Sequence, residues 1–265
     1  MVQKTQQRGT PARSDPAAGR RTPASPSEPA AGRREHAKDA RRSAIVQAAR
    51  RLMQATGEDG FSMQALADAA DVSPMTPYNL FGSKQAVMLA VLDDDLARFE
   101  ARLARVRADE LETIFKAVTL ARKLYAAEPD FYRAVFRGAL PGTAGTADRN
   151  RFRAPRRAVW TRLLQRAVEA GHIRGEPDAV IVGPSLSQIV QACVLDWLSG
   201  VLTLAQFEAR AHTGIALLLL GIAAPAARPR LLDRIATSRR TLQRARGVGG
   251  TDVPGGAPIL STPPR

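Results

Sequence analysis

Three serines recur at nearly even intervals in one stretch of the sequence, and each precedes a run with helical spacing of apolar residues. They are Ser62, Ser73 and Ser83. Serine caps helix N-termini well, because its hydroxyl accepts a hydrogen bond from a free backbone N–H. We therefore expect short helices at residues 63–70 and 74–81 and a longer helix from residue 83. The tight turn between the two short helices has the spacing of a helix-turn-helix.

The remaining sequence also follows helical periodicity, and no stretch alternates as a half-buried strand would. We predict an all-α fold of about nine helices. Glycines end the first and third helices, and a helix interrupted near Pro155 ends at about residue 170. The other predicted helices cover residues 43–55, 83–107, 110–127, 129–137, 178–198 and 204–224, with a basic helix at 230–246 as a further candidate.

Composition divides the chain into four segments. Residues 1–42 lack Ile, Leu, Phe, Tyr and Trp, and the last residues are rich in Gly and Pro. Neither end can bury enough apolar surface to offset the entropy of ordering it. We predict a disordered basic arm at 1–38, a helix-turn-helix domain at 39–99, a helical domain at 100–246 and a disordered tail at 247–265.

The charge favours a polyanionic partner. The chain has 39 Lys and Arg against 25 Asp and Glu, a formal net charge of +14, which points to nucleic acid. The single cysteine, Cys193, excludes an internal disulfide and a thiolate metal cluster. The first residues lack the apolar core of a signal peptide, and the longest apolar run is shorter than the roughly 20 residues that span a bilayer. We expect a cytoplasmic protein without a membrane segment.

The helix-turn-helix has the residue types that its geometry demands. Ala67 and Ala70 are small where the two helices cross, Val72 closes the turn, and Phe81 anchors the third helix. A helix of about seven residues is roughly 10 Å long and can enter a major groove end-on. The side chains left for base edges are Pro74, Met75, Thr76 and Asn79.

The stretch SMQALADAADVSPMTPYNLFGSKQAVMLAVL resembles the DNA-binding module of the tetracycline-repressor (TetR) family. The resemblance covers about residues 39–96, and it extends to about residue 224 through helix count and the segment DWLSGVLTLAQFEARAHTGIALLLLG. The matching features are Leu66–Ala67, Val72–Ser73, Thr76, Tyr78, Phe81 and Ser83–Lys84.

The resemblance implies a homodimeric transcription factor, usually a repressor released by a small-molecule effector, on a roughly palindromic operator. Residues 100–246 would bind the ligand and form the dimer. It places Thr76, Tyr78 and Lys84 against phosphates, Pro74, Met75 and Asn79 against bases, and Ser62 at a helix start facing a phosphate. Met75 and Pro77 depart from the family pattern. Because Pro77 cannot donate to the Ser73 carbonyl, we expect an irregular start to its helix.

One basic segment precedes this module and another follows it. The module itself is acidic, with 4 basic and 8 acidic residues at 43–100, whereas residues 1–42 hold 10 basic and 4 acidic residues. We expect the arm, with Arg41 and Arg42 next to the first helix, to contact the DNA backbone or minor groove; the alternative is a solvated tail. The arginine-rich run at 149–166 is interpreted as a solvated helix face rather than a second polyanion site.

The helix predicted at 204–224 is apolar nearly all round, so it needs partners on every side. A two-fold dimer of the last two helices would supply them; the alternative is a buried core helix of a monomer. Gly214 and Gly221 would permit close approach. The candidate dimer residues are Trp197, Ile215, Leu218, Leu219 and Ile222.

Aromatic side chains on the middle helices are candidates for a ligand pocket, since pockets between bundle helices are mostly apolar. The candidates are Phe115, Tyr125, Phe131, Phe136 and Trp160, with plain core packing as the alternative. The three histidines are too far apart in sequence for metal spacing, and no catalytic set stands out, so we expect no cofactor, no metal and no enzymatic activity. The alternative function is a non-specific, architectural nucleic-acid-binding protein driven by its basic tails.

Overall fold

The computed structural model describes residues 28–57, 61–139, 146–174 and 179–248. In these residues no strand forms beyond an isolated antiparallel bridge between Ile173 and Ala223, and the predicted all-α class is confirmed. The helices are α1 (Glu28–Thr56), α2 (Met63–Ala69), α3 (Met75–Phe81), α4 (Lys84–Leu103), α5 (Glu110–Ala127), α6 (Pro129–Ala139), α7 (Thr146–Glu169), α8 (Ala179–Leu198), α9 (Leu204–Leu220), the 3-10 turn η2 (Pro225–Ala227) and α10 (Arg228–Val248).

Helix α1 begins earlier than expected, because residues 28–42 are helical rather than disordered. This stretch is rich in Ala, Glu, Arg and Lys, which are strong helix formers, and extending an existing helix is easier than nucleating one. Pro29 lies in the first turn, where proline is tolerated. Residues up to Arg41 form a unit separate from residues 42–265, and residues 32–41 are all exposed. The disorder expected for residues 1–27 and 249–265 lies outside the described residues.

The second unit begins with a compact three-helix core. Ile45 and Met53 of α1, Leu66 of α2 and Val87 of α4 are fully buried in it. Gly57, at φ +57°, follows the last residue of α1 as predicted. Helix α4 starts in this core and continues into the bundle, where it packs against α5, α6 and α7.

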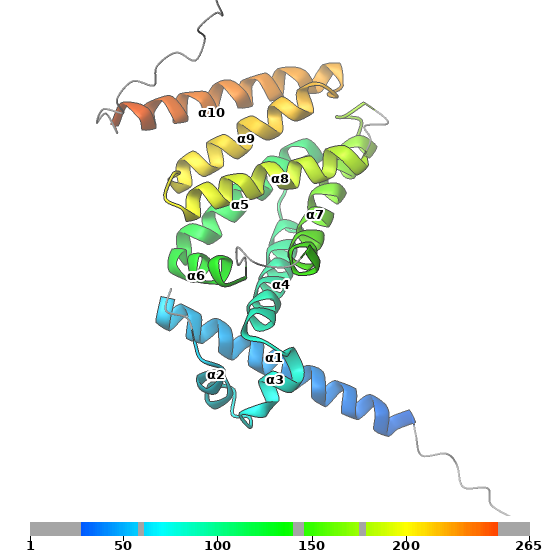
Figure 1. The fold of residues 1–265 in the computed structure, drawn as a ribbon. Coiled ribbons are helices and arrows are strands. Elements are labelled where there is room, and N and C mark those ends of the chain that lie inside the picture. The colour runs from blue at the N-terminus through cyan, green and yellow to red at the C-terminus, as the bar shows by residue number, and fades with distance from the viewer. Residues whose placement is uncertain (1–27, 58–60, 140–145, 175–178, 249–265) are drawn as a thin grey trace, which may run out of the picture. The chain divides into compact units, whose positions relative to one another are not determined.

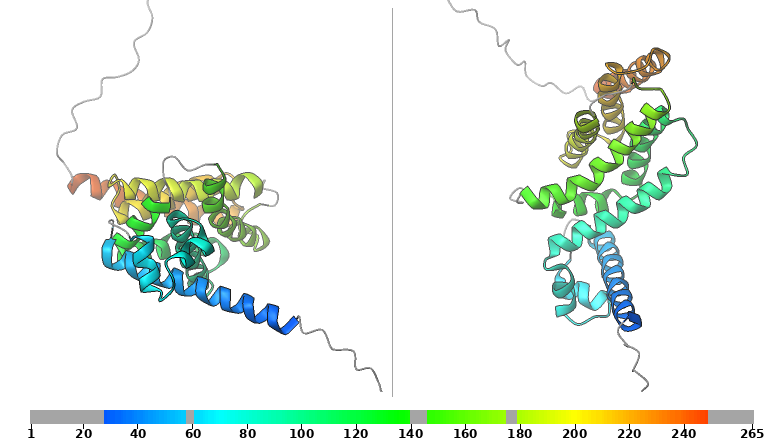
Figure 2. Two further views of the ribbon diagram at one scale, coloured as in Figure 1. Left: turned by 60° about the horizontal axis from the view of Figure 1, so that its bottom comes forward. Right: turned by 90° about the vertical axis from the view of Figure 1, so that its right-hand side faces the viewer.

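The bundle places its last three helices side by side. Helix α8 packs between α7 and α9, α9 also contacts α5, and α10 lies along α9 (Figure 1). The further views in Figure 2 show the same layering of α8, α9 and α10. Two ion pairs fasten α10 to the start of α5: Arg230 with Asp109 at 2.7 Å and Arg234 with Glu112 at 2.5 Å.

Helix α7 is continuous through Pro155, where an interruption was predicted. Proline removes one intrahelical hydrogen bond, yet Phe152 before it and Val159 after it are both buried. Tertiary packing on each side therefore holds the two halves in one helix. In addition, Arg156 Nη1 donates to the Phe152 carbonyl at 2.7 Å, which ties the residue after Pro155 to the preceding turn.

One helical segment in the described part of the chain, Ile181–Leu198 of α8, is long and apolar enough to cross a membrane by length and composition. Core helices of globular proteins have the same properties. This one packs along α7 and α9, and one side of it is exposed at Ile181 and Leu195.

Candidate nucleic-acid interface and bundle cavity

The turn between α2 and α3 is fixed by local hydrogen bonds. The Ser62 hydroxyl accepts from the Ala65 N–H at 3.0 Å, as a predicted N-cap should. After α2, the Val72 N–H donates to the Ala67 carbonyl at 3.0 Å. Asp71 adopts φ +52°, a left-handed conformation that Asp tolerates better than most residues. These bonds direct the chain from one helix into the next within a few residues.

Helix α3 begins differently from the prediction. Ser73 does not cap it: its hydroxyl bonds the Thr76 hydroxyl at 2.8 Å, and Pro74 occupies the N-cap position. The Thr76 N–H donates to the Ser73 carbonyl at 2.9 Å, which replaces the bond that Pro77 cannot make. The first turn of any helix has free N–H groups, so Pro77 fits there, and it is buried. The start of α3 is thus irregular in this one respect, with an i to i−3 bond in place of the bond from Pro77, and the helix is regular from Met75 onward.

The outward face of α3 carries most of the side chains predicted to meet bases. Met75 is 60% exposed and Tyr78 is 47% exposed, and Pro74 and Asn79 are exposed beside them. Thr76 is half-buried and engaged with Ser73. Exposed large apolar side chains on a short helix are unfavourable in water unless a partner covers them, so this face has the character of a contact surface.

Two cations flank this face, and they are placed differently from each other. Arg42 is half-buried: its Nη1 donates to the Leu80 carbonyl at 2.8 Å, and its guanidinium lies 4.2 Å from the centroid of Phe81. It therefore clamps the C-terminal end of α3, where a positive charge is favourable. Lys84 lies 5.1 Å from the ring of Phe61, in the first turn of α4. Arg41 is exposed and belongs to the first unit.

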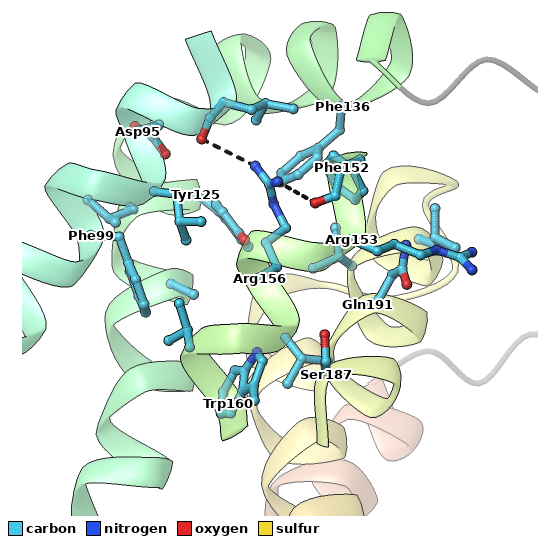
Figure 3. A pocket seen from close by; sticks show the side chains of 18 residues that line it. Asp95, Phe99, Tyr125, Phe136, Phe152, Arg153, Arg156, Trp160, Ser187 and Gln191 are labelled. Atoms are coloured by element: carbon cyan, nitrogen blue, oxygen red, sulfur yellow. Dashed lines mark hydrogen bonds between the residues drawn. The ribbon is translucent and has the colours of Figure 1, made fainter. Parts of the chain in front are cut away.

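A cavity of about 110 Å³ lies among α4, α5, α6, α7 and α8 (Figure 3). Its wall is largely apolar and aromatic, with a few polar groups. Tyr125, Phe136 and Trp160 line it, as predicted, whereas Phe115 and Phe131 are buried in the core elsewhere. Sequence reasoning missed the other side chains of interest, which are Asp95, Phe99, Phe152, Arg153, Arg156, Ser187 and Gln191.

Arg156 is the basic residue most deeply set in this wall. Its side chain is 18% exposed, and its Nη2 donates to the Leu92 carbonyl at 3.2 Å (Figure 3). The guanidinium lies 4.0 Å from the centroid of Phe152. Burial lowers the pKa of this guanidinium from its ordinary value. The arginine-rich run was predicted to be a solvated face, and Arg156 departs from that prediction.

Asp95 connects the cavity wall to the helix-turn-helix core. Its carboxylate accepts from Arg50 of α1 at 2.9 Å and from the Tyr132 hydroxyl of α6 at 3.0 Å. Arg50 also bonds Glu128 at 3.0 Å and stacks over Phe131. Burial, followed by the charge of Asp95, raises the pKa of the Tyr132 hydroxyl, so that it stays protonated and donates.

The predicted dimer residues fall into two groups. Trp197, Ile215 and Leu219 are buried within the chain itself, and Leu218 and Ile222 are half-buried. A Cβ on Gly214 would lie 2.8 Å from Ile189 Cγ2, so this glycine admits α8 against α9 inside one subunit. The apolar side chains that remain exposed on these helices are Ile181, Leu195 and Leu217.

The described residues contain no group of three or more His, Cys, Asp and Glu able to hold a metal ion. His212 is buried, and its Nε2 donates to the Phe115 carbonyl at 3.0 Å. Desolvation by burial lowers the pKa of His212 below its ordinary value. Its role is therefore structural, as a neutral core side chain.

The geometry defines a class: a helix-turn-helix DNA-binding domain followed by a helical bundle with a cavity between its helices. Residues 45–91 match the family described as "Bacterial regulatory proteins, tetR family". The resemblance inferred from the sequence is thus confirmed: the chain carries a TetR-family DNA-binding domain joined to a helical C-terminal domain. A comparison with curated protein sequences gives no match.

Solved structures share the fold at low sequence identity. RolR in complex with resorcinol is 16% identical, with a TM-score of 0.55, over 79% of this chain and 96% of RolR. A TetR transcriptional regulator from Rhodococcus sp. RHA1 is 20% identical, with a TM-score of 0.54, over 72% of this chain and 99% of its own. TylP, a TetR regulator from Streptomyces fradiae, is 24% identical, with a TM-score of 0.50, over 80% of this chain and 94% of its own.

Proposed function

We propose that this DNA-binding regulator is a homodimeric, sequence-specific repressor in the cytoplasm, which leaves its operator when a small-molecule effector binds, and that it catalyses no reaction. The observation that carries the proposal is the outward face of α3, where Met75, Tyr78 and Asn79 are exposed. Core packing requires none of these three side chains, and all three are free to contact a DNA duplex.

The chemistry of this face assigns roles to its residues. The Asn79 amide suits adenine, because it can donate and accept at the major-groove edge. Met75 and Pro74 offer apolar contact to a thymine methyl. Tyr78 and Lys84, with Thr76 and Ser62 nearer the helix starts, are assigned to phosphates, which position the protein without reading sequence.

The proposal is tested by selecting bound duplexes from a random pool and sequencing them. A regulator enriches a rough palindrome and prefers it over random DNA by about 10³-fold or more. Tyr78→Ala, which removes a phosphate contact, should weaken binding to the selected site and to random duplexes alike, whereas Asn79→Ala should relax the preference at one base position per half-site. Lys123→Ala, an exposed change on α5, serves as the control. Enrichment of no shared motif would contradict the proposal and favour the architectural alternative.

Dimerisation is proposed through the exposed apolar side chains of α8 and α9. Two copies related by a two-fold axis would cover Ile181, Leu195 and Leu217 in a four-helix interface, with the half-buried Leu218 and Ile222 at its edge. Two recognition helices would then meet successive major grooves, roughly 34–36 Å apart. Light scattering should give a dimer for the native chain and a monomer for the double variant Leu195→Glu/Leu217→Glu.

The control for this interface is Leu232→Glu, which places the same charge on an equally exposed leucine of α10. It should remain dimeric. A double variant that still scatters as a dimer would refute this interface, whatever its affinity for DNA.

Effector control is supported by the route from the cavity to the DNA-binding domain. Helix α4 contributes Val87 to the core of that domain and Asp95, Leu96 and Phe99 to the cavity wall. Because Arg50 of α1 holds Asp95, an occupant that displaces α4 would also strain α1. Displacement of a labelled operator by a bound effector, measured by fluorescence anisotropy, tests this route.

The exposed basic side chains before Arg42 are proposed to contact DNA phosphates. Replacing Arg33, Arg34 and Lys38 with Gln should weaken binding to all duplexes and flatten the dependence of affinity on salt. The log–log slope should fall by about 0.9 for each phosphate that the variant no longer neutralises. An unchanged slope would mean that these side chains contact solvent rather than DNA phosphates.

A further inference from the structure

The side chains that line the cavity indicate which chemical class of effector it binds. The inference below rests on the proposed function. Its lining includes three charged residues, Asp95, Arg153 and Arg156. The two arginines lie one turn apart on α7, with Arg153 exposed at the margin and Arg156 set into the wall. Whether the cavity attracts an anion or a cation depends on which of these charges is already neutralised within the chain.

The negative charge is neutralised. The Asp95 side chain is 15% exposed, and its carboxylate forms a 2.9 Å ion pair with Arg50 while it also accepts from Tyr132. Two donors from outside the cavity therefore saturate one face of the carboxylate. A cationic ligand would have to compete with a buried guanidinium for this group.

The positive charge of Arg156 is only weakly neutralised. The one carboxylate within 4 Å among the described residues is that of Asp93, whose Oδ1 lies 3.9 Å from Nη1. That distance is too long for a hydrogen bond. The backbone carbonyls of Phe152 and Leu92 accept from Nη1 and Nη2, and they hold the guanidinium in place while its other N–H groups are left for a ligand.

Two more polar groups of the wall are donors without a partner among the described residues. In the described part of the chain no hydrogen bond reaches the Tyr125 hydroxyl or the Trp160 indole N–H, although both residues line the cavity (Figure 3). Burial raises the pKa of the Tyr125 hydroxyl, which keeps it protonated. An indole N–H and a guanidinium can only donate, so the ligand must supply an acceptor.

The apolar part of the wall determines the size and character of the rest of the ligand. Phe99, Phe136 and Phe152 line the cavity together with Tyr125 and Trp160. The volume of about 110 Å³ is comparable to the engineered cavity of roughly 150 Å³ that binds benzene. A single ring, offered to these side chains edge-on or stacked, fills such a space.

We infer that the effector is a small aromatic carboxylate, with its ring among the aromatic side chains and its carboxylate on Arg156, on the side of the cavity where the Tyr125 hydroxyl is a further donor. The carboxylate replaces the water that a buried guanidinium would otherwise need. The exposed Arg153 at the margin attracts the anion from solvent toward the cavity.

The test uses benzoate as the probe, with benzamide as its neutral match in size and acetate as the carboxylate without a ring. Calorimetry on the full chain at fixed ionic strength should show benzoate binding at least tenfold tighter than either control. Arg156→Met should weaken benzoate by about 10- to 100-fold, and Arg156→Lys should weaken it less. Arg157→Gln, an exposed arginine on the same helix, should leave it unchanged.

The outcomes separate this inference from the function on which it rests. Operator enrichment by the ligand-free protein decides the regulator assignment, and circular dichroism shows whether Arg156→Met is folded. Benzamide binding as tightly as benzoate, acetate binding as tightly as benzoate, or a folded Arg156→Met with native benzoate affinity would each overturn the carboxylate inference while the regulator assignment stands. No binding of benzoate to the native chain would overturn it as well.

Discussion

The DNA-binding domain and the helical bundle use their polar side chains in opposite ways. Around α2, α3 and the start of α4, serine hydroxyls bond neighbours three residues away, as Ser62 does with Ala65 and Ser83 with Ala86, and the outward side chains of α3 stay exposed. In the bundle, polar groups reach inward across long sequence separations, as Arg156 does to Leu92 and His212 to Phe115. The first arrangement presents a surface to a partner, and the second shapes an interior.

The largest stability effect is expected where the two regions meet, at Arg50. Arg50→Met leaves the Asp95 carboxylate, 15% exposed, without its counter-ion, and removing one partner of a buried pair costs about 3 kcal/mol. Urea unfolding measures the loss. Arg51→Met, an exposed neighbour, should change the free energy of unfolding by less than about 0.5 kcal/mol. Equal losses for the two variants would show that the domains are not coupled through Asp95.

The second effect is a pH dependence that belongs to the bundle. The pKa of His212 is lowered by burial from 6.5, so below about pH 6.5 the unfolded chain binds a proton that the folded chain rejects. The contribution of His212 to the free energy of unfolding is therefore fully present above this pH. As the pH drops below it, the free energy of unfolding falls by up to about 1.4 kcal/mol per pH unit for one proton. His212→Gln should show a shallower fall between pH 6.5 and 5. The same slope for both chains would assign the acid sensitivity to other groups.

A smaller effect is expected at the clamp on α3. Arg42→Met removes the bond to the Leu80 carbonyl and the stacking on Phe81, at a cost of about 1–2 kcal/mol. Hydrogen exchange should show the amides of α3 opening more often, while those of α9 keep their protection. Uniform loss of protection in both helices would show that the DNA-binding domain does not open by itself.

The smallest effect is expected at the turn. Asp71 has φ +52°, so Asp71→Gly should stabilise the chain by about 0.5–1 kcal/mol and Asp71→Val should destabilise it by about 1–2 kcal/mol. Thermal unfolding of the two variants against the native chain measures the difference. A stabilising Asp71→Val would mean that the turn relaxes to another conformation.

The sequence predicted the DNA-binding domain well because its determinants are local. The caps at Ser62 and Ser83 and the glycine after α1 follow from spacing alone. Ser73 was the exception, because its hydroxyl bonds the Thr76 hydroxyl instead of a backbone N–H. Residue type alone does not reveal which of these two bonds a serine forms. Helix α1 is longer than predicted because Ala, Glu, Arg and Lys favour a helix even where no apolar residue marks a buried face.

The cavity was predicted only in part because its walls come from five helices. Tyr125, Phe136 and Trp160 were recognised as aromatic residues on middle helices, but Phe115 and Phe131 fit the same description and lie elsewhere. A usable signal was present in α7: Phe152, Arg156 and Trp160 follow one another at four-residue steps, which places an arginine on an apolar stripe. The surrounding arginines hid that signal.

The way α3 is held separates the residues that support it from the residues that face outward. Pro77 on its buried side and Arg42 at its end fix the helix, whereas Met75, Tyr78 and Asn79 have no structural partner in the described residues. Under the proposed function, substitutions at Met75 and Asn79 should therefore change which operator is bound at little expense in folding. Evolution or design can therefore change the binding preference of α3 while the residues that hold this helix stay the same.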